Sequence, residues 1–177
     1  LLTEEHGVAP EDARLLARLS GGRLGWAKAA ATDTKVLERR QLALQALLEV
    51  VDGGLEQRFQ QAQELASQFG RDRSGVRDVL GLWLSWWRDL LMLKEQAPDL
   101  VFNLDWRETL EERAKRCDRF QVANVVSELI ATLERLGQNA NARIALDVLM
   151  LAIPRVQGLQ HSASPSRPAL DPSVRRK

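Results

Sequence analysis

Side chains that usually carry chemistry are scarce in this sequence. Among its 177 residues there are one cysteine, two histidines and no tyrosine. The single cysteine, Cys117, excludes a disulfide framework within the chain and a metal site made of several cysteines. His6 and His161 lie near opposite ends of the sequence, which argues against a histidine-based triad or metal site. One free cysteine suits a reducing compartment, so we expect a cytoplasmic protein.

Sequence motifs for phosphate or zinc chemistry are also missing. There is no GxxxxGK(S/T) loop and no HExxH pair. The many carboxylates stand beside lysines and arginines at helical spacing, as Glu111, Glu112, Lys115 and Arg116 do, and solvated ion pairs explain that pattern. We therefore predict no catalytic residue, no cofactor, no metal and no enzymatic activity.

Long uncharged hydrophobic runs are absent even from the most apolar stretch, residues 76–94. Charged pairs at 77–78 and 88–89 interrupt it well below the ~18 uncharged residues that a membrane span requires. Its apolar residues fall on both faces of a helix, and such a helix is normally buried inside a helical protein. We predict a central core helix, with Trp83 and Trp87 in the core.

Hydrophobic residues recur with a helical period along the rest of the chain, up to Pro154. Two short helices are expected in 3–31, and Thr32–Thr34 is a plausible boundary between two modules. Further helices are expected at 37–51, 55–69, 122–136 and 142–153, the last one capped by Asn139 or Asn141. Residues 98–107 are expected to form an ordered crossing loop. The fold class is therefore all-α, a bundle of about five or six helices after two short ones.

The short helix after the crossing loop is expected to end near Arg116. A capping box for it is offered by Asp105 with Glu108, or by Thr109 with Glu112. Residues 155–177 carry five basic residues and one acidic residue and little that could be buried. We expect them to form a disordered basic tail.

Several residues are candidates for contact with a partner. Trp86 is expected to be half exposed, and Arg88 with Asp89 to face solvent or another subunit, since interfaces are enriched in Arg and Trp. On the later helices, Val125 and Leu146 lie off the main apolar stripes. The candidate interface is completed by two charged residues beside Leu146, which are Arg143 and Asp147.

Three short segments resemble subunits of the clamp-loader ATPase family. Residues 19–27, LSGGRLGWA, resemble the end of the lid subdomain of the AAA+ module. Residues 86–91, WWRDLL, and 141–146, NARIAL, resemble the C-terminal collar domain. The likeness runs from about Gly7 to Pro154 and is greatest to the delta-prime type of the bacterial DNA polymerase III clamp loader. It implies the end of a lid in 1–32 and a helical collar in 33–154.

The resemblance also implies a function. The chain, which begins without methionine, would be a piece of a longer polypeptide whose nucleotide-binding module and zinc loop are not in the sequence. Its collar would join those of delta and tau/gamma subunits in the ring that loads the sliding clamp during DNA replication. Contact with DNA would be indirect, and no membrane is involved. At the degenerate sensor-2 motif, Trp26 stands where the family has an arginine, unless Arg23 takes that role.

A helical nucleic-acid-binding domain is the alternative function. Trp83, Trp86 and Trp87 beside Arg88 could form a platform on which single-stranded bases stack. The basic tail would then add contacts to phosphates. This alternative requires exposed tryptophan rings.

Overall fold

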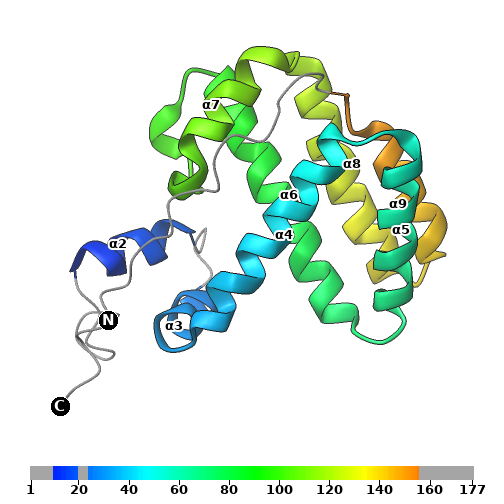
Figure 1. The fold of residues 1–177 in the computed structure, drawn as a ribbon, viewed down its shortest axis with the longest axis horizontal. Helices are drawn as coiled ribbons and strands as arrows, with labels where there is room; N and C mark the ends of the chain where they lie inside the picture. The colour runs from blue at the N-terminus through cyan, green and yellow to red at the C-terminus, as the bar shows by residue number, and fades with distance from the viewer. Residues whose placement is uncertain (1–9, 20–23, 156–177) are drawn as a thin grey trace.

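Two helices followed by a bundle of six make up the part of the chain that this computed structural model describes, residues 10–19 and 24–155. No strand occurs within those ranges, so the prediction of an all-α protein is confirmed (Figure 1). The helices are α2 (Pro10–Leu19), α3 (Leu24–Thr32), α4 (Thr34–Asp52), α5 (Leu55–Phe69), α6 (Arg73–Lys94), α7 (Arg107–Arg116), α8 (Arg119–Gly137) and α9 (Ala142–Ala152). Two 3₁₀ turns, η1 (Pro98–Leu100) and η2 (Leu104–Trp106), lie in the segment that crosses from α6 to α7.

Helix α6 runs through the middle of the bundle, as the sequence predicts (Figure 1). It begins at Arg73, because the carboxylate of Asp72 caps it by accepting a hydrogen bond from the Gly75 amide at 2.8 Å. Helices α4, α5, α7 and α8 pack against it. Its buried residues are Val76, Leu80, Leu82, Trp83, Trp86, Trp87, Asp89 and Leu90. A helix that is apolar on nearly every side requires such an environment.

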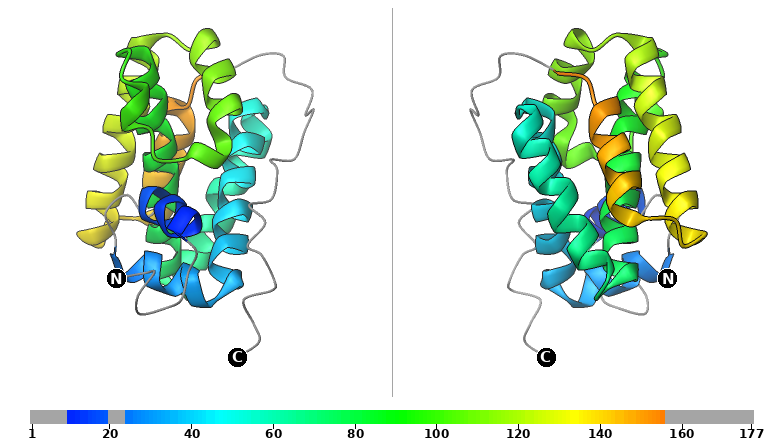
Figure 2. Two further views of the ribbon diagram at one scale, coloured as in Figure 1. Left: turned by 90° about the vertical axis from the view of Figure 1, so that its left-hand side faces the viewer. Right: turned by 90° about the vertical axis from the view of Figure 1, so that its right-hand side faces the viewer.

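Helix α9 lies between α5 and α8 and packs against both (Figure 2, right). It begins at Ala142 because the side chain of Asn141 accepts a hydrogen bond from the Ile144 amide at 3.2 Å. Asn139, the other predicted cap, has φ 58° and accepts a hydrogen bond from Arg73 at 2.7 Å instead. It occupies the left-handed backbone region that asparagine tolerates after a helix.

The hydrophobic residues form two separate cores. The larger core fills the bundle from α4 to α9. The smaller one contains Ala13, Leu16, Ala27 and Ala30, with contacts from the first turns of α4. Between α3 and α4 the helical path breaks only at Asp33, whose side chain caps α4 by accepting from the Lys35 amide at 2.9 Å. The predicted boundary at 32–34 therefore lies just before the first turns of α4, where the smaller core adjoins the larger one.

The segment from Pro98 to Trp106 is an ordered crossing, as predicted. The capping box predicted at its end is wrong, because α7 begins at Arg107 after Trp106 and has no side-chain cap. Asp105 cannot serve as a cap because its carboxylate binds the guanidinium of Arg40, with Nη1–Oδ2 at 2.6 Å. The predicted end of α7 near Arg116 is confirmed.

A buried arginine joins the C-terminal ends of two helices. Arg58 of α5 is 2% exposed, and its guanidinium donates to Val50 O at 2.9 Å and Val51 O at 3.1 Å, near the end of α4. It also donates to the carbonyls that end α9, at Met150 (3.4 Å), Ile153 and Pro154 (3.1 Å). Burial lowers the pKa of Arg58, and the charge of Arg155 lowers it further. The negative ends of two helix dipoles favour the cation at this position.

Replacing Arg58 should weaken the link between the ends of α4 and α9. Arg58→Lys keeps the charge but has too few donors for the carbonyls, and each unsatisfied buried group costs about 1–3 kcal/mol. We expect the free energy of unfolding in urea to fall by roughly 2–4 kcal/mol. Arg71→Lys, at an exposed position that follows α5, is the matched control and should change it by less than about 0.5 kcal/mol. Equal stability of the two variants would contradict the role given to Arg58.

The tryptophans of α6 allow a second test of the core. Trp83 and Trp87 are both 0% exposed, but only the Nε1 of Trp83 has a partner among the described residues, Ala43 O at 2.9 Å. Either residue changed to Ala should lower the unfolding free energy by about 3–5 kcal/mol. The variant Trp83→Phe should lose about 1 kcal/mol more unfolding free energy than Trp87→Phe, because it also loses a hydrogen bond. Urea melts measure both differences, and a loss below about 1 kcal/mol for Trp87→Ala would show that the ring is not core.

Candidate functional site

The residues predicted to face a partner divide into a buried group and an exposed group. Four of them are at most 1% exposed, and for these the expected exposure is wrong: Trp86, Asp89, Val125 and Leu146. The cause is that α6, α8 and α9 are each covered from more than one side, so residues off the main stripes still meet a neighbouring helix. Arg88, Arg143 and Asp147 are accessible, with 33%, 41% and 28% of their side chains exposed.

Burial of the three tryptophans also bears on the stacking platform. Trp83, Trp86 and Trp87 have at most 1% of their surface exposed, and Trp86 and Trp87 pack edge to face with centroids 5.5 Å apart. A ring that stacks on a base must present a free face. The described fold therefore offers no free ring face for the alternative, a base-stacking platform, and the prediction that Trp83 and Trp87 lie in the core is confirmed.

Several other residues singled out in the sequence fall outside the described part of the chain. Arg23 of the sensor-2 motif is one of them, and so is the side chain of Trp26, although its backbone belongs to α3. Residues 156–177 of the predicted tail and both histidines also lie outside.

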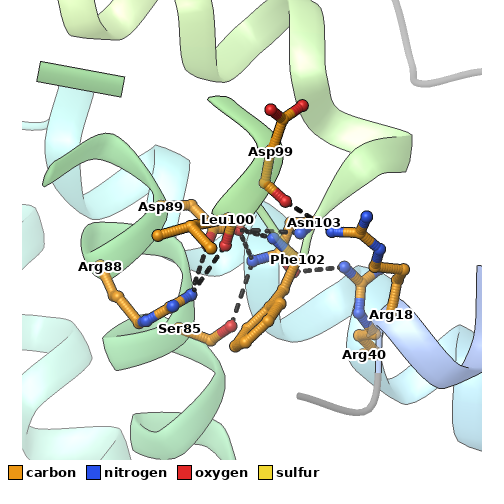
Figure 3. A network of polar contacts seen from close by, with 9 residues as sticks. All are labelled: Arg18, Arg40, Ser85, Arg88, Asp89, Asp99, Leu100, Phe102 and Asn103. Atoms are coloured by element: carbon orange, nitrogen blue, oxygen red, sulfur yellow. Dashed lines mark hydrogen bonds and ion pairs between the residues drawn. The ribbon is translucent and has the colours of Figure 1, made fainter. Parts of the chain in front are cut away.

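Asp89 is the centre of a buried polar network between α6 and the crossing segment (Figure 3). Its carboxylate is 0% exposed and accepts three hydrogen bonds at Oδ2: from the Phe102 amide at 3.0 Å, the Asn103 amide at 2.8 Å and Asn103 Nδ2 at 2.7 Å. Burial raises the pKa of Asp89, and these donors and the Arg88 cation oppose that increase. The donors replace the water that a buried carboxylate loses.

Arginines extend this network in two directions. Arg88 donates to Asp89 Oδ1 at 3.3 Å and to Leu100 O at 3.1 Å, and its guanidinium lies 4.0 Å from the centroid of the Phe102 ring. Arg40 of α4, only 3% exposed, donates to Asn103 Oδ1 and to both oxygens of Asp105.

Helix α2 reaches the same segment, because Arg18 donates to Asp99 O at 2.6 Å (Figure 3). The network thus fixes residues 98–106 to α2, α4 and α6 at once. The carboxylate of Asp89 is fully enclosed, so no reacting group could approach it. The network therefore serves to position this segment.

The accessible site that sequence reasoning missed is the outer face of α9. Ile144, Val148 and Leu151 are 62%, 40% and 60% exposed, and their steps of four and three residues place them in one line, which we call the α9 stripe. The opposite face is buried between α5 and α8. The spacing was visible in the sequence, but α9 is apolar on nearly all sides, and periodicity alone could not indicate which side is covered.

Charged groups flank the α9 stripe on the side of α5. Arg143 and Asp147 form an ion pair at 2.8 Å, and Arg143 also donates to Gln63 of α5 at 3.1 Å. Other large exposed apolar residues are spread over different elements: Leu42, Leu55, Leu100, Phe120 and Ile130. An apolar line with a charged edge is the usual composition of an interface patch.

Other kinds of site are scarce among residues 10–19 and 24–155. No group of three His, Cys, Asp or Glu residues there could hold a metal ion, and no helix there is long and apolar enough to cross a membrane. Cys117 is buried, and burial raises the pKa of its thiol. Comparison with protein-family models, with curated proteins and with solved structures gives no match to this chain.

Removing the carboxylate of Asp89 tests the network directly. In Asp89→Ala the amides of Phe102 and Asn103 and the Asn103 side chain lose their acceptor, and each unpaired buried group costs about 1–3 kcal/mol. We expect the two amides to exchange with deuterium at least about tenfold faster, as measured by NMR. The control is Asp78→Ala, an exposed aspartate on the same helix, which should leave both rates unchanged. Unchanged exchange in Asp89→Ala would disprove the anchoring role.

Proposed function

We propose that this chain is the C-terminal part of a clamp-loader subunit, of the delta-prime type of bacterial DNA polymerase III. Residues up to 32 are the end of its AAA+ lid, and 33–154 are its collar. The collar is a non-catalytic module that binds the collars of delta and tau/gamma subunits. The ring so formed loads the sliding clamp during DNA replication, in the bacterial cytoplasm, and this module contacts DNA only through the whole complex.

The observation that carries the proposal is the division of the chain into two cores that adjoin in the first turns of α4. The resemblance assigns the lid to 1–32 and the collar to 33–154, and the smaller core joins α2 and α3 to the first turns of α4 while the larger one runs from Leu44 in α4 to α9. A lid and a collar that belong to different bodies require such a division, because each must hold its own shape. Among the described residues, the parts are linked by the start of α4, by the packing of α2 against η2 and by the bond from Arg18 to Asp99.

The segments that carry the resemblance give further support. Residues 86–91 lie in α6 at the centre of the bundle, and Asp89 within them organises the crossing segment. In the segment 141–146, Asn141 caps α9. Both segments hold the helices of a bundle in place, which suits a scaffold whose surface binds other subunits.

Association with clamp-loader partners tests this function. The chain alone should elute as a monomer in size exclusion with light scattering. Mixed at micromolar concentration with delta and tau/gamma subunits of the same organism, it should co-elute with them. A chain that never co-elutes but shifts a single-stranded oligonucleotide at moderate salt would refute the proposal and favour nucleic-acid binding.

A further inference from the structure

The path from α3 to α4 is broken at a single residue. Helix α3 ends at Thr32 and α4 begins at Thr34, and Asp33 between them is extended, with φ −126° and ψ 109°. The amide of Asp33 still donates to Ala29 O at 2.8 Å, as in an unbroken helix, and the amide of Val36 donates to Asp33 O at 3.1 Å. Little more than the backbone of Asp33 therefore separates this bend from a continuous helix.

The bend replaces part of the helical ladder with local side-chain bonds. In an unbroken helix each amide donates to the carbonyl four residues earlier. Here the amide of Lys35 donates to the carboxylate of Asp33 at 2.9 Å, and the hydroxyl of Thr32 donates to the carbonyls of Lys28 and Ala29 at 3.2 Å. The first bond is a typical N-cap, and bonds of the second kind often bend a helix. The alanine-rich stretch 27–31 favours the uninterrupted ladder instead.

The contacts that hold the bend are few and small. In the smaller core three of the four buried residues are alanines, and Leu16 is the fourth. Alanine buries little apolar area, so this core contributes little packing energy. Among the described residues, α2 is also attached by its packing against η2 and by the bond from Arg18 to Asp99 O at 2.6 Å. Arg18 is exposed, so water competes for this bond.

The surface that receives Arg18 is fixed, in contrast. Residues 98–106 are bound to α6 through the carboxylate of Asp89 and to α4 through the guanidinium of Arg40 (Figure 3). Loss of the Arg18 bond would therefore move α2 and leave the crossing segment in place. Helix α2 packs against α3, so the two helices would turn together about Asp33.

We propose that Asp33 is a switch between two orientations of α2 and α3 relative to the bundle. In the bent state, which the structure shows, the bond from Arg18 to Asp99 latches α2 onto the crossing segment. In the extended state Asp33 is helical, α3 and α4 form one helix over residues 24–52, and the latch is open. The packing of α2 against α3 is kept in both states. This inference does not rest on the proposed function, and its failure would leave that function standing.

The distance between two spin labels, one on α3 and one on α4, tests the switch in the whole chain. Ala29→Cys and Glu49→Cys place the labels at exposed positions, and Cys117 should not react because it is buried. In a continuous helix the two Cα atoms would be about 30 Å apart, at a rise of about 1.5 Å per residue. The bend shortens that distance, so double electron–electron resonance separates the two states. In the wild type the shorter distance should predominate.

Two substitutions should increase the extended state, and a third is the matched control. Arg18→Ala removes the latch and should raise the fraction at the long distance about fivefold, the effect of one hydrogen bond on an equilibrium. Asp33→Ala removes the cap and supplies the best helix former, so it should raise that fraction about tenfold. Lys35→Gln changes an exposed charge beside the bend but keeps the capped amide, and should leave the fraction unchanged.

A proline at position 34 provides a variant that is locked in the bent state. Thr34 is the first residue of α4, a position that proline favours. Proline there holds Asp33 in the extended region and is incompatible with the interior of a continuous helix. Thr34→Pro should therefore abolish the long distance, also when it is combined with Arg18→Ala or Asp33→Ala.

Three results would overturn the switch. The first is a short distance that stays unchanged in both Arg18→Ala and Asp33→Ala. The second is a long distance that survives Thr34→Pro, since the movement would then not come from a continuous helix. The third is one broad distribution in place of two distances, which would show that α3 unfolds instead of turning.

Discussion

The enclosed carboxylate of Asp89 determines how the chain passes from α6 to α7. A charge without access to water must find donors within the protein, and here the amides of Phe102 and Asn103 supply them. To bring two consecutive amides to one oxygen, the segment between α6 and α7 folds into 3₁₀ turns across the flank of the helix. Arg40 can then reach Asn103 and Asp105, and Arg18 can reach Asp99. The buried charge of Asp89 therefore helps, through this segment, to hold α2 and α4 beside α6.

The end of α4 is fixed in a similar way by buried arginines. Arg113 of α7 binds both oxygens of Asp52 at 2.5 and 2.7 Å, and Arg58 of α5 binds the carbonyls of the two residues before it, Val50 and Val51. These guanidinium groups are 2% exposed, so their bonds are not weakened by solvent as those of surface pairs are. Because Arg58 also holds the end of α9, the bonds that anchor α4 fix the helix that carries the exposed stripe.

Local signals in the sequence account for the helix boundaries that could be predicted. Asp33, Gly70, Asn141 and Pro154 each stop or start a helix through their own geometry, without help from distant residues. The side of a helix that becomes buried depends on its neighbours. The sequence therefore predicts Leu146 on the outside, although the outer line is that of Ile144, Val148 and Leu151. Asp89 beside Arg88 resembled a solvent pair, because the amides that enclose it come from a segment whose 3₁₀ path has no clear sequence signature.

The exposed apolar line on α9 and the stability of the bundle are physically independent. Side chains that remain in water after folding contribute almost nothing to the difference between the folded and unfolded states, so stability of the bundle gives no reason to have them there. Such residues do affect association, because their removal from water stabilises the complex. A protein that associates through its surface has to combine the two properties, with helices fixed by buried charges inside and apolar side chains left uncovered outside. In this chain Arg58 and the stripe provide them on the inner and outer sides of the same helix.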